Sequence, residues 1–423
     1  MSDAADSDWQ VIVVGAGAAG LVAAERAASR GLRTLLLEKN PRPGVKILMS
    51  GGTRCNLTHD TDARGIVAAY GPPGRFLNSA LAALGPRELV ALVEAEGVPT
   101  KIEETGKIFP VSNRATDILA AFLARLARTS CTLAVGEAVV SLRRTESHFA
   151  VTTARRTLSC AGLILTVGGQ SYPGSGTTGD GYSWCRELGH TIVPPRPALV
   201  PLVTATPWVT GLRGITVPDV GLRVLGPPKS PDEPNSKRPT LGSARGSLLF
   251  THFGLSGPVA LDVSRYVSAE PHPETLALEC DFVPEWSAER LDESFRAAAA
   301  AGGKRGVASL LPDELPRRLG ETLLHELGID GQLRAAELPR QQRLQMVETL
   351  KHTRLALQGT RGFKSAEVTA GGVALHEVHS RTLESKLVPH LHIAGELLDL
   401  DGPIGGFNFQ AAFSTGWLAG LSV

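Results

Sequence analysis

Residues 11–20 read VIVVGAGAAG, and this stretch decides the fold. Its apolar start, Val11–Val14, predicts a buried strand, and the alanine-rich segment 18–30 predicts a helix that Gly31 ends. Between them lies G-x-G-x-x-G, with glycine at positions 15, 17 and 20. The first glycine permits the tight turn, the second lets the backbone approach a pyrophosphate, and the third lets helix pack on strand. The pattern predicts a dinucleotide-binding βαβ unit.

A second strand, TLLLE, is predicted over 33–38 and ends at Glu38, 18 residues beyond Gly20. A carboxylate there can accept hydrogen bonds from both ribose hydroxyls, which favours NAD or FAD over a 2′-phosphorylated nucleotide. The helix N-terminus at Ala18 favours the phosphates. A glycine-rich loop over 44–56, GVKILMSGGTRCN, follows early and suggests a ligand that extends past the pyrophosphate.

Composition sets the broad class. The chain has 423 residues, enough for two to three domains, and 43% are apolar, which excludes wholesale disorder. The net charge of +1 argues against a protein whose main function is to bind nucleic acid or an anionic membrane. The five cysteines lie at least 25 residues apart, so we expect neither a CxxC metal site nor a disulfide scaffold, and a reducing cytoplasm fits. The sequence shows neither a secretory signal nor an apolar run of transmembrane length.

The rest of the chain predicts an inserted region. Residues 115–128 read as a helix, 131–167 as strands, 199–281 as short strands with turns, and 286–352 as helical. Residues 226–245 read as a mobile loop, and a final helix is predicted from about Gln410. We therefore predict an α/β protein with a Rossmann-like FAD-binding domain, an inserted β-barrel-like domain and a helical subdomain. The predicted boundaries are 1–194 and 371–423, 195–285 with 353–370, and 286–352.

Four segments resemble one group of proteins. They are 44–56, 168–190 (GGQSYPGSGTTGDGYSWCRELGH), 368–373 (VTAGGV) and 394–410 (AGELLDLDGPIGGFNFQ). Together they are similar to the bacterial flavoproteins that contain the aminoacetone oxidases and a reductase of bile-acid dehydroxylation. The resemblance runs from about residue 10 to 421. The TGDG element at 178–181 is also similar to one in the fumarate reductase and succinate dehydrogenase flavoproteins.

The resemblance implies FAD bound in an extended pose, an inserted β-barrel-type substrate domain and a helical subdomain. It places Gly15, Ala19 and Gly20, with Gly17 and Ala18 of the fingerprint, on the pyrophosphate, and Glu38 and Lys39 near the adenosine ribose. The implied residues on the ribityl–flavin side are Lys46, Ser50, Gly51, Arg54, Cys55 and Asn56. Val139 would offer its backbone to adenine, and Gly395 and Glu396 would meet the ribityl–phosphate region. The residues implied at the flavin ring are Gly405, Gly406, Phe407 and Asn408, and Gly168 ends a strand on the cofactor side.

The C-terminal loop supports this independently, because a reduced flavin needs donors near N1 and the C2 carbonyl. The loop 402–409 and the helix after it can supply backbone N–H groups there. The sequence departs from the family pattern GRKILMSGGGRCN at Val45 and Thr53, and Pro403-Ile404 stands where an aromatic residue is common. These departures bear on the shape of the substrate.

Several single residues keep two interpretations. Cys55 has no nearby cysteine, which favours a structural or flavin-contacting thiol over a redox thiol. Asp180 is either an N-cap of a helix over 181–189 or a flavin contact. His252 is a weak candidate for the catalytic acid or base and otherwise structural, and no other catalytic residue can be named. Arg54 suits contact with an anion or with flavin.

The other G-x-G-x-x-G of the sequence, at 174–179, does not directly follow a predicted strand, so we expect no separate nicotinamide domain. Either NADPH or NADH docks transiently and reduces the flavin, or the substrate reduces FAD and oxygen reoxidises it. The leading hypothesis is an NAD(P)H-linked oxidoreductase that moves a hydride between flavin N5 and a small organic substrate, with no nucleic acid or membrane partner and no metal. The alternatives are an amine oxidase that makes hydrogen peroxide, an RNA-modifying flavoprotein and a non-enzymatic redox sensor.

Overall fold

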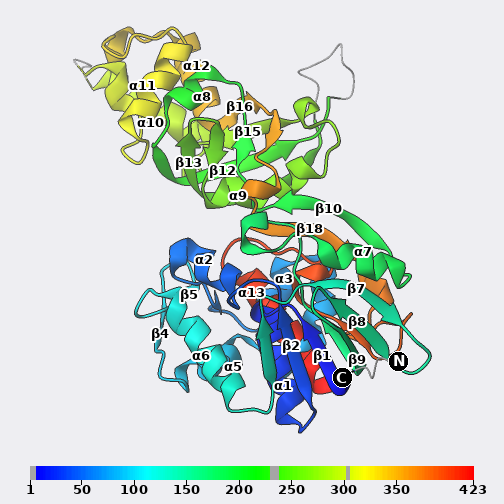
Figure 1. Ribbon diagram of the computed structural model, residues 1–423. Coiled ribbons are helices and arrows are strands. Elements are labelled where there is room, and N and C mark those ends of the chain that lie inside the picture. Colours follow the sequence, from blue (N-terminus) through cyan, green and yellow to red (C-terminus); the bar gives the residue numbers. More distant parts are fainter. Residues whose placement is uncertain (1–5, 229–237, 302–304) are drawn as a thin grey trace. The chain divides into compact units, whose positions relative to one another are not determined.

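The computed structural model describes residues 6–228, 238–301 and 305–423 (Figure 1). The chain divides into two compact units. Unit 1 comprises residues 1–196 and 367–423, and unit 2 comprises residues 197–366. Each unit has its own hydrophobic core. The C-terminal segment thus belongs to the same unit as the N-terminal fingerprint.

A seven-stranded sheet forms the centre of unit 1. Its strands are β1 (Asp6–Val14), β2 (Thr34–Glu38), β6 (Thr132–Val135), β7 (Val139–Arg144), β8 (Phe149–Thr153), β9 (Thr157–Leu165) and β19 (Leu391–Ile393). The order is β6-β2-β1-β9-β8-β7, and β19 pairs with β9. The pairs among β6, β2, β1, β9 and β19 are parallel, whereas β7 and β8 form an antiparallel extension. This confirms the predicted Rossmann-like α/β domain.

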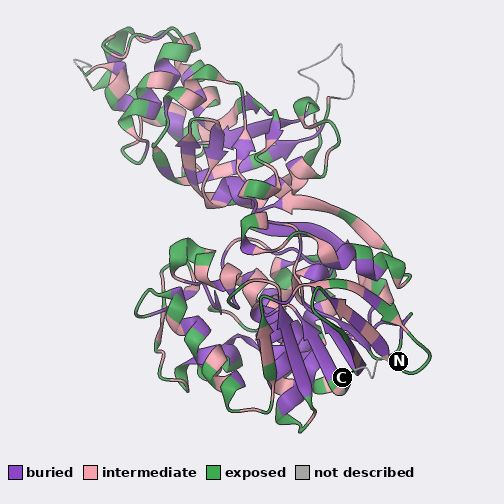
Figure 2. Cartoon of the chain, in the orientation of Figure 1, coloured by how far each residue is buried: buried purple, intermediate pink, exposed green. Residues whose placement is uncertain are grey.

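The fingerprint strand and helix are buried as their composition predicts. Val11–Val14 are at most 4% exposed, and the strands at the centre of the sheet are mainly buried in Figure 2. Helix α1 (Ala18–Ser29) packs against the final helix α13 (Phe407–Ser422). A Cβ atom at Gly416 would lie only 2.2 Å from the Ala19 carbonyl oxygen. The small residue therefore lets the first and last helices of the chain approach closely.

The remaining elements of unit 1 surround this sheet. The helices are α2 (Val45–Thr53), α3 (Ala63–Ala69), α4 (Asn78–Ala83), α5 (Pro86–Glu94), α6 (Ala115–Ala127) and α7 (Asp180–Glu187). A small sheet has the order β3-β5-β4, from Thr58–His59, Lys107–Pro110 and Thr100–Ile102. Strands β10 (Ile192–Ala198) and β18 (Val368–Val373) form a two-stranded sheet.

Unit 2 combines a sheet with helices, in line with the strands and helices predicted for the inserted region. Its seven strands have the order β16-β15-β12-β13-β14-β11-β17, and the pairs described are antiparallel. The strands span Thr353–Ala356, Ala277–Asp281, Thr216–Leu225, Thr240–Thr251, Gly254–Ser256, Leu202–Val203 and Gly359–Thr360 in that order. The helices are α8 (Pro207–Gly211), α9 (Pro258–Ser268), α10 (Ala288–Ala300), α11 (Arg317–Glu326) and α12 (Arg340–His352).

The structure corrects four local predictions. The loop predicted over 44–56 contains helix α2, because its apolar start forms a turn before Ser50, Gly51 and Gly52 leave helical geometry. The loop predicted over 226–245 ends in strand β13, which pairs with β12, while residues 229–237 lie outside the described residues. The stretch 199–281 includes helix α9. The last helix begins at Phe407 rather than near Gln410.

Within the described ranges, no single helix is long and apolar enough to span a membrane. The segments Pro72–Ala83 and Pro86–Glu94 reach the length and apolar composition of a membrane span only when they are counted together, and a bend of 41° separates them. Leu77, Leu81, Leu89 and Val93 from this pair are buried in the core of unit 1.

Candidate cofactor site

The three fingerprint glycines have three different surroundings. Gly15 has a φ of +97°, and a Cβ atom there would lie 2.8 Å from the Thr166 carbonyl oxygen. At Gly20 a Cβ atom would lie 1.7 Å from the Gly15 carbonyl oxygen. At Gly17, by contrast, a Cβ atom would meet no atom within 4 Å. The first and third glycines are therefore required by packing, whereas the second keeps open space before the first turn of α1.

That open space faces groups suited to a phosphate and a ribose. Gly17 is the N-cap of α1 and offers no capping side chain, so N–H groups of the first turn remain available to a ligand. Glu38 is 7% exposed at the end of β2. Its carboxylate accepts hydrogen bonds from the N–H groups of Ala16 and Asn40, both at 2.8 Å. A carboxylate has about four acceptor positions, so these two bonds leave capacity for a hydroxyl.

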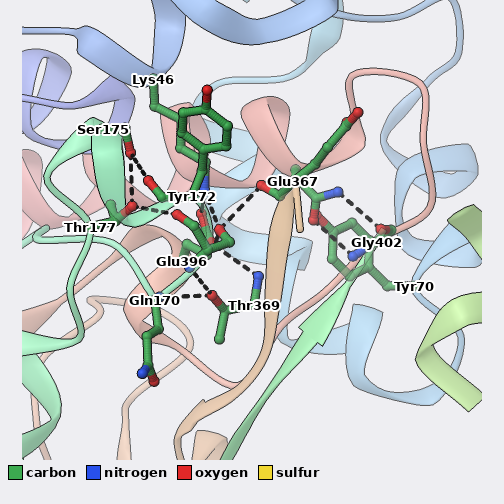
Figure 3. Close-up of polar contacts among 12 residues, drawn as sticks. Lys46, Tyr70, Gln170, Tyr172, Ser175, Thr177, Glu367, Thr369, Glu396 and Gly402 are labelled. Carbon is green, nitrogen blue, oxygen red and sulfur yellow. Dashed lines mark hydrogen bonds and ion pairs between the residues drawn. The ribbon is translucent and has the colours of Figure 1, made fainter. Parts of the chain in front are cut away.

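A polar cluster joins four distant segments of unit 1 (Figure 3). The Lys46 ammonium donates to Glu396 at 2.6 Å and to Ser171 Oγ at 2.7 Å. Glu396 also accepts from Ser171 Oγ and from the Thr369 N–H, both at 2.8 Å. The predicted residues Lys46 and Glu396 are thus brought together across 350 positions of sequence. Gly395 approaches the fingerprint as well, since a Cβ atom there would lie 3.0 Å from the Ala19 Cβ.

Sequence reasoning missed two members of this cluster. Ser171 and Thr369 position Glu396, and Thr369 Oγ1 accepts the N–H groups of Gln170 and Ser171 at 2.8 and 2.9 Å. Both residues lie inside segments that carried the family resemblance, and this was the available signal. Nothing in the local pattern indicates that the Ser171 hydroxyl and the Thr369 N–H donate to one carboxylate.

The C-terminal loop is closed by its own side chains. Asn408 Oδ1 accepts from the Gly402 N–H at 2.8 Å, and its amide donates to the Gly402 carbonyl at 2.9 Å. The Tyr70 hydroxyl donates to the Phe407 carbonyl at 3.0 Å. The ring of Phe407 stacks on His59 with a centroid separation of 4.6 Å. Tyr70 and His59 were not predicted, because their relation to this loop exists only in the folded chain.

Asn56 joins the glycine-rich segment 44–56 to the C-terminal loop 402–409. In the amide orientation that satisfies both of its polar atoms, Asn56 accepts from the Gly406 N–H at 2.9 Å and donates to the Thr58 carbonyl at 3.0 Å. Gly406 has a φ of +92°, and a Cβ atom there would lie 2.6 Å from the Thr58 backbone. Glycine is therefore required by both conformation and space at the start of α13.

Arg54 and Cys55, which also lie in the segment 44–56, contact other residues of the protein. Arg54 pairs with Glu103 at 2.6 Å and lies 4.0 Å from the centroid of the Phe109 ring. Cys55 is fully buried, and burial raises the pKa of its thiol to about 12, only partly opposed by a hydrogen bond with Ser50. A thiol with this pKa is protonated at neutral pH, which favours the structural interpretation.

Asp180 does not cap its helix, which corrects one of its two interpretations. The N-cap of α7 is Gly179, and Asp180 is the first helical residue. Its carboxylate instead accepts from Lys39 at 2.6 Å and from Thr178 at 2.7 Å. Burial opposes ionisation, but these hydrogen bonds outweigh it and hold the pKa of Asp180 below its usual value. Lys39 and Asp180, both predicted site residues, therefore form an ion pair.

Three further predicted residues, Val139, Gly168 and His252, lie outside the polar cluster and the C-terminal loop. Val139 begins β7, two residues after Glu137, whose N–H donates to the Glu38 carbonyl at 2.9 Å. Gly168 follows β9 with a φ of +75°. His252 lies in unit 2, between β13 and β14, with its ring edge-on to Phe253. Its catalytic role stays a prediction. Among the described residues, no group of three or more His, Cys, Asp or Glu side chains is suited to hold a metal ion.

Comparison with known proteins identifies the family. The model of the HI0933-like protein Rossmann domain matches residues 9–422. The chain belongs to this family. It is 31% identical over 412 residues to the ribosomal RNA dihydrouridine synthase of Escherichia coli K12, covering 97% of this chain and 96% of that protein. It is also 30% identical over 411 residues to the 3-dehydro-bile acid delta(4,6)-reductase of Clostridium scindens, covering 96% and 97%.

A solved structure supports the fold of this HI0933-like protein. The open conformation of a flavocytochrome c3 fumarate reductase matches with a TM-score of 0.50 and 15% identity, covering 99% of this chain and 78% of that one. The predicted resemblance to the flavoproteins that include a bile-acid reductase is confirmed. By family and fold the chain is an FAD-dependent oxidoreductase.

The residues present fit FAD. Open space at Gly17, an uncapped helix N-terminus and the buried carboxylate of Glu38 provide for a pyrophosphate and a ribose. The loops that carry Lys46 and Glu396 are fixed beside the same turn by the Ala19–Gly395 contact. The individual cofactor contacts listed from the sequence stay predictions.

Proposed function

We propose that this HI0933-like protein is an NAD(P)H-linked reductase that saturates a carbon–carbon double bond conjugated to a carbonyl group. The observation that carries the proposal is the full-length similarity to two kinds of enzyme whose names share this chemistry. Dihydrouridine is uridine with the double bond of its uracil ring saturated, and a delta(4,6)-reductase saturates double bonds of a steroid. The uracil ring of ribosomal RNA is the first acceptor to test.

The reaction balances with NAD(P)H as the named reductant. Bound FAD supplies hydride transfer between donor and acceptor. The acceptor gains one hydride and one proton, its double bond becomes a single bond, and NAD(P)H becomes NAD(P)+. Of the two G-x-G-x-x-G segments in the sequence, only the one at 15–20 directly joins a strand to a helix, so we expect the nicotinamide nucleotide to dock transiently rather than in a domain of its own.

The thiols support direct transfer to an organic acceptor rather than a disulfide relay. All five cysteines are free, and none is exposed. Burial raises the pKa of Cys55, Cys131, Cys160 and Cys185 to about 12 and raises that of Cys280 as well. A relay needs a reactive thiolate pair, and these thiols are protonated and apart in the sequence.

The protein's own residues keep space for the cofactor and fix the loops around it. The turn from Gly15 to Gly20 keeps space for phosphates, and the pairing of Lys46 with Glu396 fixes the second loop against the C-terminal segment. Asn56 and Asn408 fix the loop before α13. A reductase that draws on NAD(P)H works where that reductant is available, which favours the cytoplasm.

A steroid-like unsaturated ketone is the second candidate acceptor. The similarity to the bile-acid reductase favours it, and so does the net charge of +1, which offers no overall excess of basic residues for RNA. The similarity to ribosomal RNA dihydrouridine synthase favours RNA. These two observations point in opposite directions, so the experiment must separate the acceptors.

The test begins with an anaerobic titration of the purified protein with NADPH and then NADH, following the visible flavin absorbance. Reduced enzyme is then mixed with ribosomal RNA from cells that lack the gene, or with an unsaturated 3-oxosteroid. We expect bleaching by a nicotinamide and reoxidation by RNA, with dihydrouridine detected by mass. Reoxidation by the steroid alone selects the second candidate.

Two results would refute the proposal. A preparation that releases no FAD on denaturation lacks the cofactor on which the reaction depends. A yellow protein that ignores both nicotinamides, but is reduced by a primary amine and makes peroxide in air, is an amine oxidase instead.

A further inference from the structure

Tyr172 presents a large aromatic ring from a strained backbone. Its φ and ψ are +52° and +66°, in the left-handed region, and the residue is 42% exposed. A non-glycine residue in this region costs about 1–2 kcal/mol. The same loop has glycine at its other left-handed positions, Gly176 and Gly179, with φ of +95° and +80°. The strain at position 172 is therefore retained together with an exposed tyrosine ring.

The residues on both sides of Tyr172 are fixed. Before it, the Ser171 N–H donates to Thr369 at 2.9 Å, and the Ser171 carbonyl accepts from Thr177 Oγ1 at 2.6 Å. After it, the Tyr172 carbonyl accepts from the N–H and the hydroxyl of Ser175, both at 2.9 Å. Strained residues persist where the surroundings determine them in this way, and they gather at functional sites.

Tyr172 directly follows Ser171, a member of the polar cluster. Ser171, the preceding residue, bonds both Lys46 and Glu396, and Figure 3 shows these side chains with Tyr172 in one view. The charges of Lys46 and Glu396 neutralise each other at 2.6 Å. What this part of unit 1 offers to a ligand next to the cluster is therefore an aromatic face rather than a net charge.

We propose that Tyr172 is a specificity-determining residue whose ring stacks on the planar, uncharged conjugated ring of the acceptor. This inference rests on the proposed function, because uracil and an unsaturated ketone ring share that planar character. Stacking of a base on an aromatic side chain changes affinity by about 5- to 150-fold, and it depends on the ring rather than on the hydroxyl.

The test compares Tyr172→Phe, Tyr172→Ala and Tyr172→Gly in the FAD-loaded enzyme. We expect the phenylalanine variant to keep KM for the acceptor within about threefold. The alanine and glycine variants should raise KM about 10- to 100-fold with unchanged FAD content. Glycine relieves the strain that alanine keeps, so Tyr172→Gly should melt about 2–4 °C above Tyr172→Ala.

His390→Gly is the matched control. His390 is exposed in unit 1, has a φ of +63° and has no assigned role in the cofactor site. Its replacement should raise the melting temperature through the same relief of strain and leave KM unchanged. Together, the control and the Tyr172 series separate the loss of a ring from the loss of backbone strain.

Four outcomes decide whether the inference stands. A Tyr172→Gly enzyme with wild-type KM overturns the inference, and so does a loss of FAD in both small variants, which would assign the ring to the cofactor. Equilibrium dialysis with uridine monophosphate and with an unsaturated 3-oxosteroid separates this inference from the proposed function. If one binds to wild type but is not reduced, and Tyr172→Gly weakens its binding, the function fails and the inference stands. If neither binds, both fail.

Discussion

Two alanine substitutions in the glycine motif should affect different properties, one the stability of the apo protein and the other its affinity for FAD. Gly20→Ala places a methyl group 1.7 Å from the Gly15 carbonyl oxygen and 2.7 Å from Thr166 Oγ1. Gly17→Ala places the same methyl group where no protein atom lies within 4 Å, on a backbone with φ −81° and ψ −165° that alanine adopts freely. The first change strains the apo protein, whereas the second fills the space kept for the pyrophosphate.

The magnitudes follow from these distances. A Cβ atom stays at least 3.0 Å from such an oxygen, so Gly20→Ala must open the turn by about 1.3 Å. Overpacking usually costs about 1–3 kcal/mol, and with the Gly15 backbone on one side and Thr166 Oγ1 on the other we expect about 3 kcal/mol or more. For Gly17→Ala, the loss of a favourable N-cap residue is offset by the reduced entropy of the unfolded chain. The free energy of unfolding should therefore change by less than about 1 kcal/mol. Its FAD affinity should fall at least about tenfold.

The assay is urea unfolding of both apo-variants, followed by circular dichroism, together with FAD titration by visible absorbance. We expect a lower midpoint for Gly20→Ala, and a wild-type midpoint with weak FAD binding for Gly17→Ala. The reasoning is refuted if Gly17→Ala binds FAD as wild type does. It is equally refuted if the two variants unfold alike.

Three further predictions concern single side chains. Glu396→Gln should destabilise the apo protein by about 1 kcal/mol because it leaves the partly buried Lys46 without its counter-charge, and a Lys46→Met background should abolish the difference in melting temperature. Burial of His392 lowers its pKa to about 4, mainly by desolvation, so the unfolded state takes up the proton first and stability is lost as pH falls from about 6.5 to 4. The loss should reach about 3 kcal/mol, and His392→Phe should flatten this pH dependence of urea unfolding. Native Cys55 should resist iodoacetamide at neutral pH, and alkylation before unfolding would contradict its buried, protonated state.

The Rossmann core could be predicted because its signals are local. Val11–Val14 are apolar and buried, the glycines at 15, 17 and 20 have fixed spacing, and Glu38 ends the next strand. Each of these features constrains residues near it in sequence, so the pattern determines the geometry. The parallel pairing of β1 with β2 and β9 follows once these strands are recognised.

The errors have a common physical cause. The polar start of strand β13, residues 240–245, was predicted as loop, because only its pairing with β12 stabilises an extended chain there. Asp180 has the residue type of an N-cap, but its carboxylate pairs with Lys39, 141 positions away, and Gly179 is the N-cap instead. Partners that distant are absent from the local pattern.

The same limit explains why the cofactor site could be listed but not assembled from the sequence. Lys46, Ser171, Thr369 and Glu396 come from four segments, and every bond among them crosses at least 27 positions. A carboxylate that accepts three donors holds those segments together only when all of them are present. The C-terminal segment is therefore a structural part of the N-terminal site, and the charge on Glu396 stabilises the site through Lys46 even before a cofactor contributes a contact.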